Sequence, residues 1–147
     1  MKTFRLLILF ATLTLISFAV GCNSLRISIN ETNPPVFRFS AGQLAECCRH
    51  LAFLTVSEIP DRQSDANAKI IWEIRPVSGT DNSAEGLPQI TYGQVPPGFV
   101  QKIPTVGPPP PLQEGKIYEA SGPPVEVPEA YVRFVIRDGK AIQMPRR

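Results

Sequence analysis

"YVRFVIRDGK", residues 131–140, is the stretch that decides the fold class. Apolar side chains alternate with polar ones along it, with Val132, Phe134 and Ile136 on one face and Arg133 and Arg137 on the other. This two-residue period predicts a β-strand with one face in the core and the other toward solvent. The Asp-Gly pair that follows predicts a type I′ turn, because that turn needs positive φ at both central positions. The next strand should therefore return beside this one as an antiparallel hairpin.

The rest of the chain from Val36 onward repeats this organisation. Short segments rich in β-branched and aromatic residues alternate with clusters of Pro, Gly, Asn and Asp, which is typical of strands and turns. The expected strands are Val36–Phe39, Leu51–Ser57, Ala68–Ile74, Gln89–Tyr92, Phe99–Ile103, Lys116–Glu119, Tyr131–Arg137 and Lys140–Met144. The only helical period is a single turn over Ala41–Arg49. Eight short strands predict an all-β fold, a two-layer antiparallel β-sandwich of the immunoglobulin or fibronectin type III kind.

The strongest core candidate lies in "KIIWEI", residues 69–74. Ile70, Trp72 and Ile74 recur at period two and are expected to share the core face, with Ile71 and Glu73 on the opposite face. The 16 prolines stand between the expected strands, as boundaries. Their densest run, "VGPPPPL" at 106–112, predicts polyproline II. We interpret this run as a stiff crossover between the two sheets rather than a ligand for a proline-binding module, since such modules are chiefly intracellular partners.

The first segment has the layout of a secretory signal peptide. Lys2 and Arg5 give a positive start, and the apolar run Leu6–Val20 leads to Gly21 and Cys22. The run is shorter than the roughly 20 residues that a membrane-spanning helix needs. We therefore expect residues 1–21 to be removed by cleavage.

Ala19-Val20-Gly21-Cys22 resembles the lipobox of bacterial lipoproteins. The resemblance implies cleavage before Cys22, attachment of diacylglycerol and acyl chains such as palmitate to this cysteine, and a bacterial cell-envelope protein held in a membrane by lipid. Asn23 and Ser24 stand where an inner-membrane retention signal has Asp, which favours the outer membrane in a host with two membranes. The alternative is ordinary signal cleavage that leaves a free thiol, which would be a hazard in an oxidising compartment.

The mature chain divides into a lipidated N-terminus and tether, residues 22–35, and a β-sandwich domain, residues 36–147. The alternation of Leu25, Ile27 and Ile29 leaves open whether the tether runs into a first edge strand. Loss of Lys2 and Arg5 leaves 13 basic and 13 acidic side chains and a formal charge of zero. Because no basic cluster remains, the sequence predicts no nucleic-acid partner.

"LQEGKIY", Leu112–Tyr118, resembles the Leu-x-Pro-Gly-x-x-Tyr stretch of fibronectin type III domains, with Glu114 in the place of proline. In that family the tyrosine bonds back to upstream backbone and forms a corner. The order of segments along the whole chain is similar to that of uncharacterised small bacterial lipoproteins with an all-β body. This second resemblance implies a cellular location and a fold, and it implies no particular chemistry.

The one compact cluster of reactive side chains is "ECCRH", residues 46–50. Cys47 and Cys48 are interpreted first as structural cysteines and second as a vicinal or intermolecular disulfide, since their Cα atoms are too close for an unstrained bond. A zinc site needs three or four ligands at matched spacings, and a thiol nucleophile activated by His50 would need a spatial arrangement that adjacency in sequence does not give. We therefore predict no metal and no cofactor.

Tyr92, Phe99 and Tyr118 lie near proline-rich loops, so they either line a ligand patch at one end of the sandwich or complete its core. No catalytic set stands out. The sequence predicts a lipid-anchored envelope protein that is not an enzyme and acts as a binding or assembly module for a protein partner. The alternative is a small periplasmic enzyme or a redox or metal-binding protein that uses Cys47, Cys48 and His50.

Overall fold

The computed structural model describes residues 25–41, 50–60, 67–84, 86–87, 89–122 and 131–145. These residues form strands and no helix. The strands are β1 (Leu25–Ile29), β2 (Val36–Ala41), β3 (Leu54–Ile59), β4 (Lys69–Pro76), β5 (Gln89–Thr91), β6 (Phe99–Ile103), β7 (Ile117–Ser121), β8 (Tyr131–Arg137) and β9 (Lys140–Gln143). The eight strands expected from the sequence are all present, with ends that differ by up to three residues. Of the helical turn expected over Ala41–Arg49, Ala41 is the last residue of β2 and residues 42–49 lie outside the described residues.

β1 is the strand that the sequence left open. Leu25 and Ile27 are fully buried and their neighbours face outward, so the alternation belongs to a strand that packs into the core. β1 lies at the edge of its sheet and pairs with β2 from Leu25↔Ala41 to Ile29↔Phe37. Of the two alternatives for residues 22–35, a tether alone or a tether that runs into a first edge strand, the structure has the edge strand at Leu25–Ile29.

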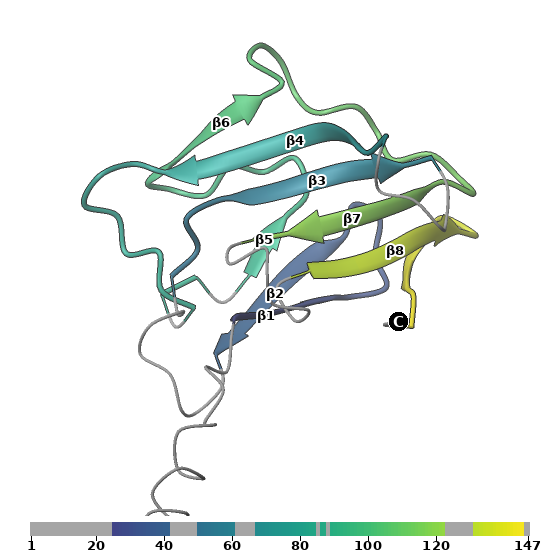
Figure 1. The fold of residues 1–147 in the computed structure, drawn as a ribbon, viewed down its shortest axis with the longest axis horizontal. Helices are drawn as coiled ribbons and strands as arrows, with labels where there is room; N and C mark the ends of the chain where they lie inside the picture. The colour runs from purple at the N-terminus through teal and green to yellow at the C-terminus, as the bar shows by residue number, and fades with distance from the viewer. Residues whose placement is uncertain are drawn as a thin grey trace, which may run out of the picture.

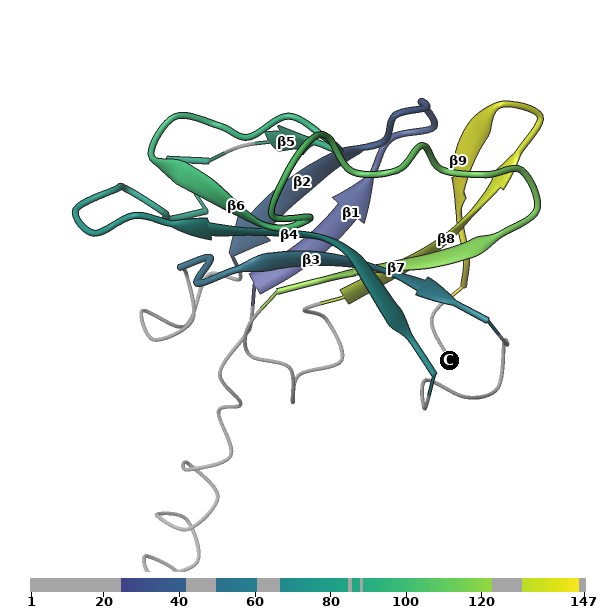
Figure 2. The same cartoon turned by 90° about the horizontal axis from the view of Figure 1, so that it is seen from above.

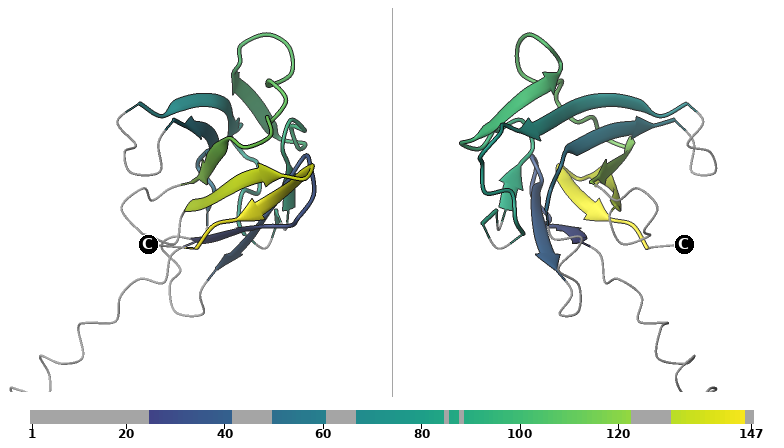
Figure 3. Two further views of the ribbon diagram at one scale, coloured as in Figure 1. Left: turned by 90° about the vertical axis from the view of Figure 1, so that its right-hand side faces the viewer. Right: turned by 60° about the vertical axis from the view of Figure 1, so that its left-hand side comes forward.

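The strands form two antiparallel sheets in a sandwich-like arrangement. A three-stranded sheet has the order β1-β2-β5, and a six-stranded sheet has the order β6-β4-β3-β7-β8-β9 (Figures 1 and 2). The six-stranded sheet curls over the three-stranded one, and β1 lies against β8 and β9 (Figure 3). The expected all-β fold with two antiparallel layers is confirmed.

Aromatic contacts join the two sheets through the core. The rings of Phe37 on β2 and Phe134 on β8 have centroids 6.2 Å apart. Trp72 on β4 meets Tyr92, the residue after β5, edge to face at 5.2 Å. Such pairs add about 0.5–1.5 kcal/mol of stability to the contribution of the apolar area that they bury. Because each pair has one ring from each sheet, these contacts fix how the layers stack.

The β8–β9 hairpin forms as the sequence predicts. Val132, Phe134 and Ile136 are buried, and Arg137 pairs with Lys140 across the turn. Asp138 and Gly139 have φ of 51° and 69°, as a type I′ turn requires. Both turn N–H groups donate to the carboxylate of Glu114, at 2.6 and 3.3 Å. The side chain that stands where fibronectin type III domains have proline thus holds this turn.

A β-bulge in β4 changes the face that one expected core residue occupies. Val56 pairs with Trp72 and Ser57 pairs with Ile70, so Ile71 has no partner on β3. At a bulge two successive residues oppose one, and the strict two-residue alternation fails. Ile71 therefore joins Trp72 in the core, whereas Ile70 is 41% exposed. Trp72 and Ile74 are core residues as expected, but the placement of Ile70 in the core was wrong.

The proline-rich crossover is also placed differently from the expectation. It connects β6 to β7, two strands of the same six-stranded sheet, and passes β4 and β3 on the side of the three-stranded sheet (Figure 2). The Tyr92 hydroxyl donates to the carbonyl oxygen of Pro110 at 2.7 Å, and Gln101 donates to the carbonyl oxygens of Pro104 and Gly107. The segment therefore crosses within one sheet and closes the core, where a link between the two sheets was expected.

Replacing Tyr92 with phenylalanine should loosen this crossover and change the response to alkali. Burial raises the pKa of Tyr92 above its ordinary value of 10.0. Above about pH 10 the unfolded chain loses this phenolic proton first, so stability is constant below that pH and falls as the pH rises through it. The variant lacks one hydrogen bond, so its free energy of unfolding at neutral pH should be lower by about 0.5–1.5 kcal/mol. It should also lack the part of the fall in stability above pH 10 that comes from the Tyr92 phenol. Urea denaturation from pH 7 to 11 measures both.

The matched control is Tyr131→Phe, which removes a hydroxyl from a half-buried ring on β8. We expect the difference in the free energy of unfolding between wild type and Tyr92→Phe to become smaller above pH 10. The corresponding difference for Tyr131→Phe should stay small at every pH. A difference in the free energy of unfolding between wild type and Tyr92→Phe that is the same at every pH would contradict the claim that burial keeps the Tyr92 phenol neutral.

Candidate functional site

The reactive cluster of the sequence is described only at His50. Cys22, Cys47 and Cys48 lie outside the described residues. His50 is exposed, forms an isolated bridge to Ser83, and its Nδ1 lies 3.2 Å from the Asn82 side-chain oxygen. The nearby Asp81 carboxylate accepts hydrogen bonds from the Ser83 hydroxyl and from the Ser83 backbone N–H, and these bonds lower the pKa of Asp81. These bonds hold the loop that packs beside Leu51 and form no nucleophile–base pair.

No cluster of three or more potential metal ligands occurs within the part of the chain that the structure describes. Over the same ranges, no helix has the length and hydropathy to cross a membrane.

The three aromatic residues offered as a ligand patch are core residues. Tyr92, Phe99 and Tyr118 are 5%, 7% and 1% exposed, so the proposed patch was wrong and the alternative, completion of the core, is found. Tyr118 stacks on Phe134, and its hydroxyl accepts the Gln113 backbone N–H at 2.9 Å. This bond ties the Tyr118 ring to backbone five residues upstream.

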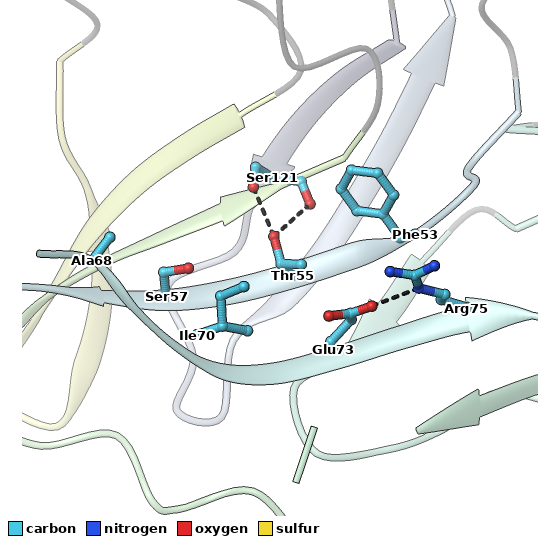
Figure 4. Close-up of a pocket in the computed structure, with 8 residues that line it drawn as sticks. All are labelled: Phe53, Thr55, Ser57, Ala68, Ile70, Glu73, Arg75 and Ser121. Atoms are coloured by element: carbon cyan, nitrogen blue, oxygen red, sulfur yellow. Dashed lines mark hydrogen bonds and ion pairs between the residues drawn. The ribbon is translucent and has the colours of Figure 1, made fainter. Parts of the chain in front are cut away.

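The candidate site lies instead on the outer face of the six-stranded sheet. A depression of about 420 Å³ covers the middle of β3 and β4 and the end of β7 (Figure 4). Its size falls within the range of small-ligand and peptide sites. Most of the exposed surface of the lining is apolar, although five of its eight residues are polar or charged: Phe53, Thr55, Ser57, Ala68, Ile70, Glu73, Arg75 and Ser121.

The backbone explains why these side chains face the same way. Thr55 pairs with Glu73 on one side and with Ser121 on the other, so the three side chains form a row across β4, β3 and β7. Trp72 and Ile74, the neighbours of Glu73, point into the core because successive strand residues alternate. The bulge at Ile71 adds Ile70 to the outer face, so the same irregularity that removes Ile70 from the core supplies apolar surface to the depression.

Charge is concentrated at one end of the depression. Glu73 is only 7% exposed although it lies on the outer face, and its Oε1 accepts from the Nε of Arg75 at 2.6 Å. The Arg75 side chain is 56% exposed. A carboxylate that is buried on a sheet face needs such a partner, because an unpaired buried charge is strongly unfavourable. Glu73 in turn fixes the direction of the guanidinium group.

Hydroxyl groups occupy the middle of the depression. Thr55 is buried, and its Oγ1 lies 2.8 Å from the Ser121 Oγ and 3.4 Å from the Ser121 carbonyl oxygen. The two hydroxyls satisfy each other, so they form a polar floor with a fixed geometry. The guanidinium group of Arg75 and the carboxylate of Glu73 are therefore the polar groups of the lining that could bind a ligand (Figure 4).

The arrangement offers a ligand one oriented guanidinium group and one carboxylate beside an apolar surface. Its one carboxylate is held by an arginine, and no nucleophile with an adjacent base lies among the described lining residues. Sequence reasoning missed Glu73 and Arg75. The available signal was Glu73 itself, a charged residue inside the apolar run "IIWEI".

Comparisons with protein-family models, curated proteins and solved structures found no match to this chain.

Proposed function

We propose that this protein is a lipid-anchored envelope protein whose body is a non-enzymatic binding or assembly module for another protein. The observation that carries the binding role is the outer-face depression, an apolar hollow with an oriented arginine at one end. Pockets of this composition, apolar with a few placed polar groups, are typical of recognition sites. The lipobox-like stretch that ends at Cys22 supports the anchor.

The body is, in this proposal, a sandwich of the immunoglobulin or fibronectin type III kind. In that kind, strands A, B and E belong to one sheet and strands C, F and G to the other. Taken in chain order, β1, β2 and β5 correspond to the first set, and β3, β7 and β8 to the second, with β4, β6 and β9 as additions. The bond of Tyr118 to Gln113 near the start of β7 supports this correspondence, because the tyrosine corner stands at the start of strand F.

The position of β1 has a consequence for the proposed anchor. Cys22 and Leu25 are three residues apart, and a fully extended chain spans at most about 3.6 Å per residue. A lipid on Cys22 would therefore hold the start of β1 within about 11 Å of the lipid-bearing residue. In this arrangement the body sits against the membrane surface, without the long tether that residues 22–35 were expected to form.

Chemical crosslinking in the native envelope, followed by mass spectrometry, tests the binding role. We expect crosslinks from the lysines of the body to one other envelope protein, in a constant ratio across preparations. Crosslinks only between copies of this chain would contradict a binding module for another protein and indicate a homo-oligomer. Metal analysis and thiol titration of the purified protein test the redox or metal alternative, which stoichiometric metal or an unusually acidic thiol would support.

A further inference from the structure

We propose that the outer-face depression binds the C-terminal residue of a partner polypeptide, with its carboxylate on Arg75, its amide N–H on Glu73 and its apolar side chain on Ile70 and Phe53. This inference rests on the proposed function, because it names the ligand of the same binding body. Its basis is the set of hydrogen-bonding groups that the depression leaves unused.

Arg75 supplies the site for a carboxylate. Its Nε donates to Glu73, and the two Nη groups have no partner among the described residues. A guanidinium group carries five N–H donors in a planar fork that matches the two oxygens of a carboxylate. The Arg75 side chain is half-exposed, so these donors are accessible from solvent. In Figure 4 they lie on the side of the Arg75 side chain that faces Phe53.

Glu73 supplies the site for an N–H donor. Its side chain is nine-tenths buried, Oε1 accepts from Arg75, and Oε2 has no partner among the residues that the structure describes. In Figure 4 this second oxygen points along the depression, away from Arg75. A buried acceptor without a donor is unfavourable, so a ligand N–H placed there removes a cost that the free protein bears.

The two charges together select the class of ligand. A simple anion would meet the negative charge of Glu73 beside Arg75, and a simple cation would meet the positive charge of Arg75. The last residue of a polypeptide carries an amide N–H and a carboxylate on the same carbon, so it presents a donor and an anion side by side. Charge complementarity therefore favours a peptide terminus over an acidic side chain, which lacks the adjacent N–H.

The apolar lining receives the side chain of that residue. Ile70 is 41% exposed on the outer face, next to Ala68 and within the same depression as Phe53. An apolar side chain laid here covers surface that water now contacts, which favours binding. The hydroxyls of Thr55 and Ser121 are already paired and place no demand on the ligand.

The test uses the full chain in detergent micelles, labelled with ¹⁵N, and N-acetyl-phenylalanine as the probe. The probe has the amide N–H, the carboxylate and an apolar ring. Its neutral analogue, N-acetyl-phenylalanine amide, has an uncharged NH2 group in place of one carboxylate oxygen. We expect saturable chemical-shift changes at the backbone amides of Thr55, Glu73 and Ser121 with the acid, and at least tenfold weaker binding of the analogue. Equal shifts with both probes, or no shifts, would overturn the proposal.

Two variants sharpen the result. Arg75→Lys keeps the charge beside Glu73 but loses the fork, so binding of the acid should weaken about tenfold. Arg137→Lys, an exposed arginine at the far hairpin, is the matched control and should bind as wild type does. Wild-type affinity in Arg75→Lys would overturn the assignment. If Arg75→Lys fails to fold, Ile70→Ser replaces it with the same expectation.

A further probe separates the source of the carboxylate. Free phenylalanine carries an ammonium group in place of the acyl amide. We expect it to bind more weakly than N-acetyl-phenylalanine, because bringing an ammonium group to the buried Glu73 oxygen costs more hydration than bringing an amide N–H there. Tighter binding of the free amino acid would overturn the peptide terminus and assign a small-molecule site. If no probe binds, the peptide terminus is rejected as the ligand of the depression. The proposed function is then tested separately by crosslinking in the envelope, which does not depend on these probes.

Discussion

Replacing Cys22 with serine is expected to abolish incorporation of a metabolic fatty-acid label into this protein. A thiolate is a much stronger nucleophile than a hydroxyl, and the lipoprotein resemblance assigns the lipid to this one thiol. The change should be all-or-none, at least a tenfold fall in label relative to protein, and the precursor should accumulate uncleaved. Immunoprecipitation after labelling with an alkyne-bearing fatty acid measures both effects.

The matched controls are Cys47→Ser and Cys48→Ser, which remove the other two thiols of the chain. Each should retain full labelling and normal processing. Label that persists in Cys22→Ser, or that disappears in one of the two controls, would place the lipid elsewhere and remove the basis for the short membrane tether.

Replacing Trp72 with alanine is expected to give the largest loss of stability of any single substitution discussed for the body. Trp72 is fully buried, packs edge to face on Tyr92 of the opposite layer, and donates from Nε1 to the Gln101 side chain at 3.1 Å. Truncation leaves a cavity and an unpaired acceptor. Large-to-small changes of this kind cost about 3–5 kcal/mol, a large part of the 5–15 kcal/mol that stabilises a typical domain.

Urea denaturation monitored by circular dichroism measures the change in the free energy of unfolding. Val106→Ala is the control, because Val106 is 87% exposed in the crossover and its truncation should change stability by less than about 0.5 kcal/mol. A loss below about 1.5 kcal/mol in Trp72→Ala would mean that the tryptophan does not join the two layers as the structure indicates.

The fold class could be predicted from sequence because local signals and tertiary structure agree in most strands. The alternation in Tyr131–Arg137 and the Asp-Gly turn specify a hairpin whatever surrounds it, and β8 and β9 form as expected. Strand β1 was harder to assign, because its alternation spans only five residues and depends on a partner, β2, for its place in a sheet.

The candidate site could not be predicted in the same way. It depends on a bulge at Ile71, and periodicity assigned Ile70 to the core because an isolated run of apolar residues does not mark where the register shifts. Glu73 and Arg75 stand two residues apart and read as ordinary exposed charges. Only the pairing of β4 with β3 shows that Glu73 is buried on the outer face beside Thr55.

The aromatic residues could not be assigned from the sequence. Tyr92, Phe99 and Tyr118 lie near proline-rich loops, which left a surface patch and the core as alternatives. The proline-rich crossover lies over Tyr92, and the carbonyl oxygen of Pro110 accepts a hydrogen bond from the Tyr92 hydroxyl. The loop therefore covers the core. A non-local contact of this kind leaves no periodic signal in the chain.

We propose that this body recognises another protein through the depression on its outer sheet face. The most direct measurement places a photocrosslinking amino acid at position 70 in the full chain and irradiates the native envelope, with position 106 as the control site. We predict that position 70 captures one polypeptide through its C-terminal segment, and that Arg75→Lys reduces this capture about tenfold while capture at position 106 is weak and unaffected. Capture of the same proteins at both positions, or only of further copies of this chain at position 70, would contradict the account.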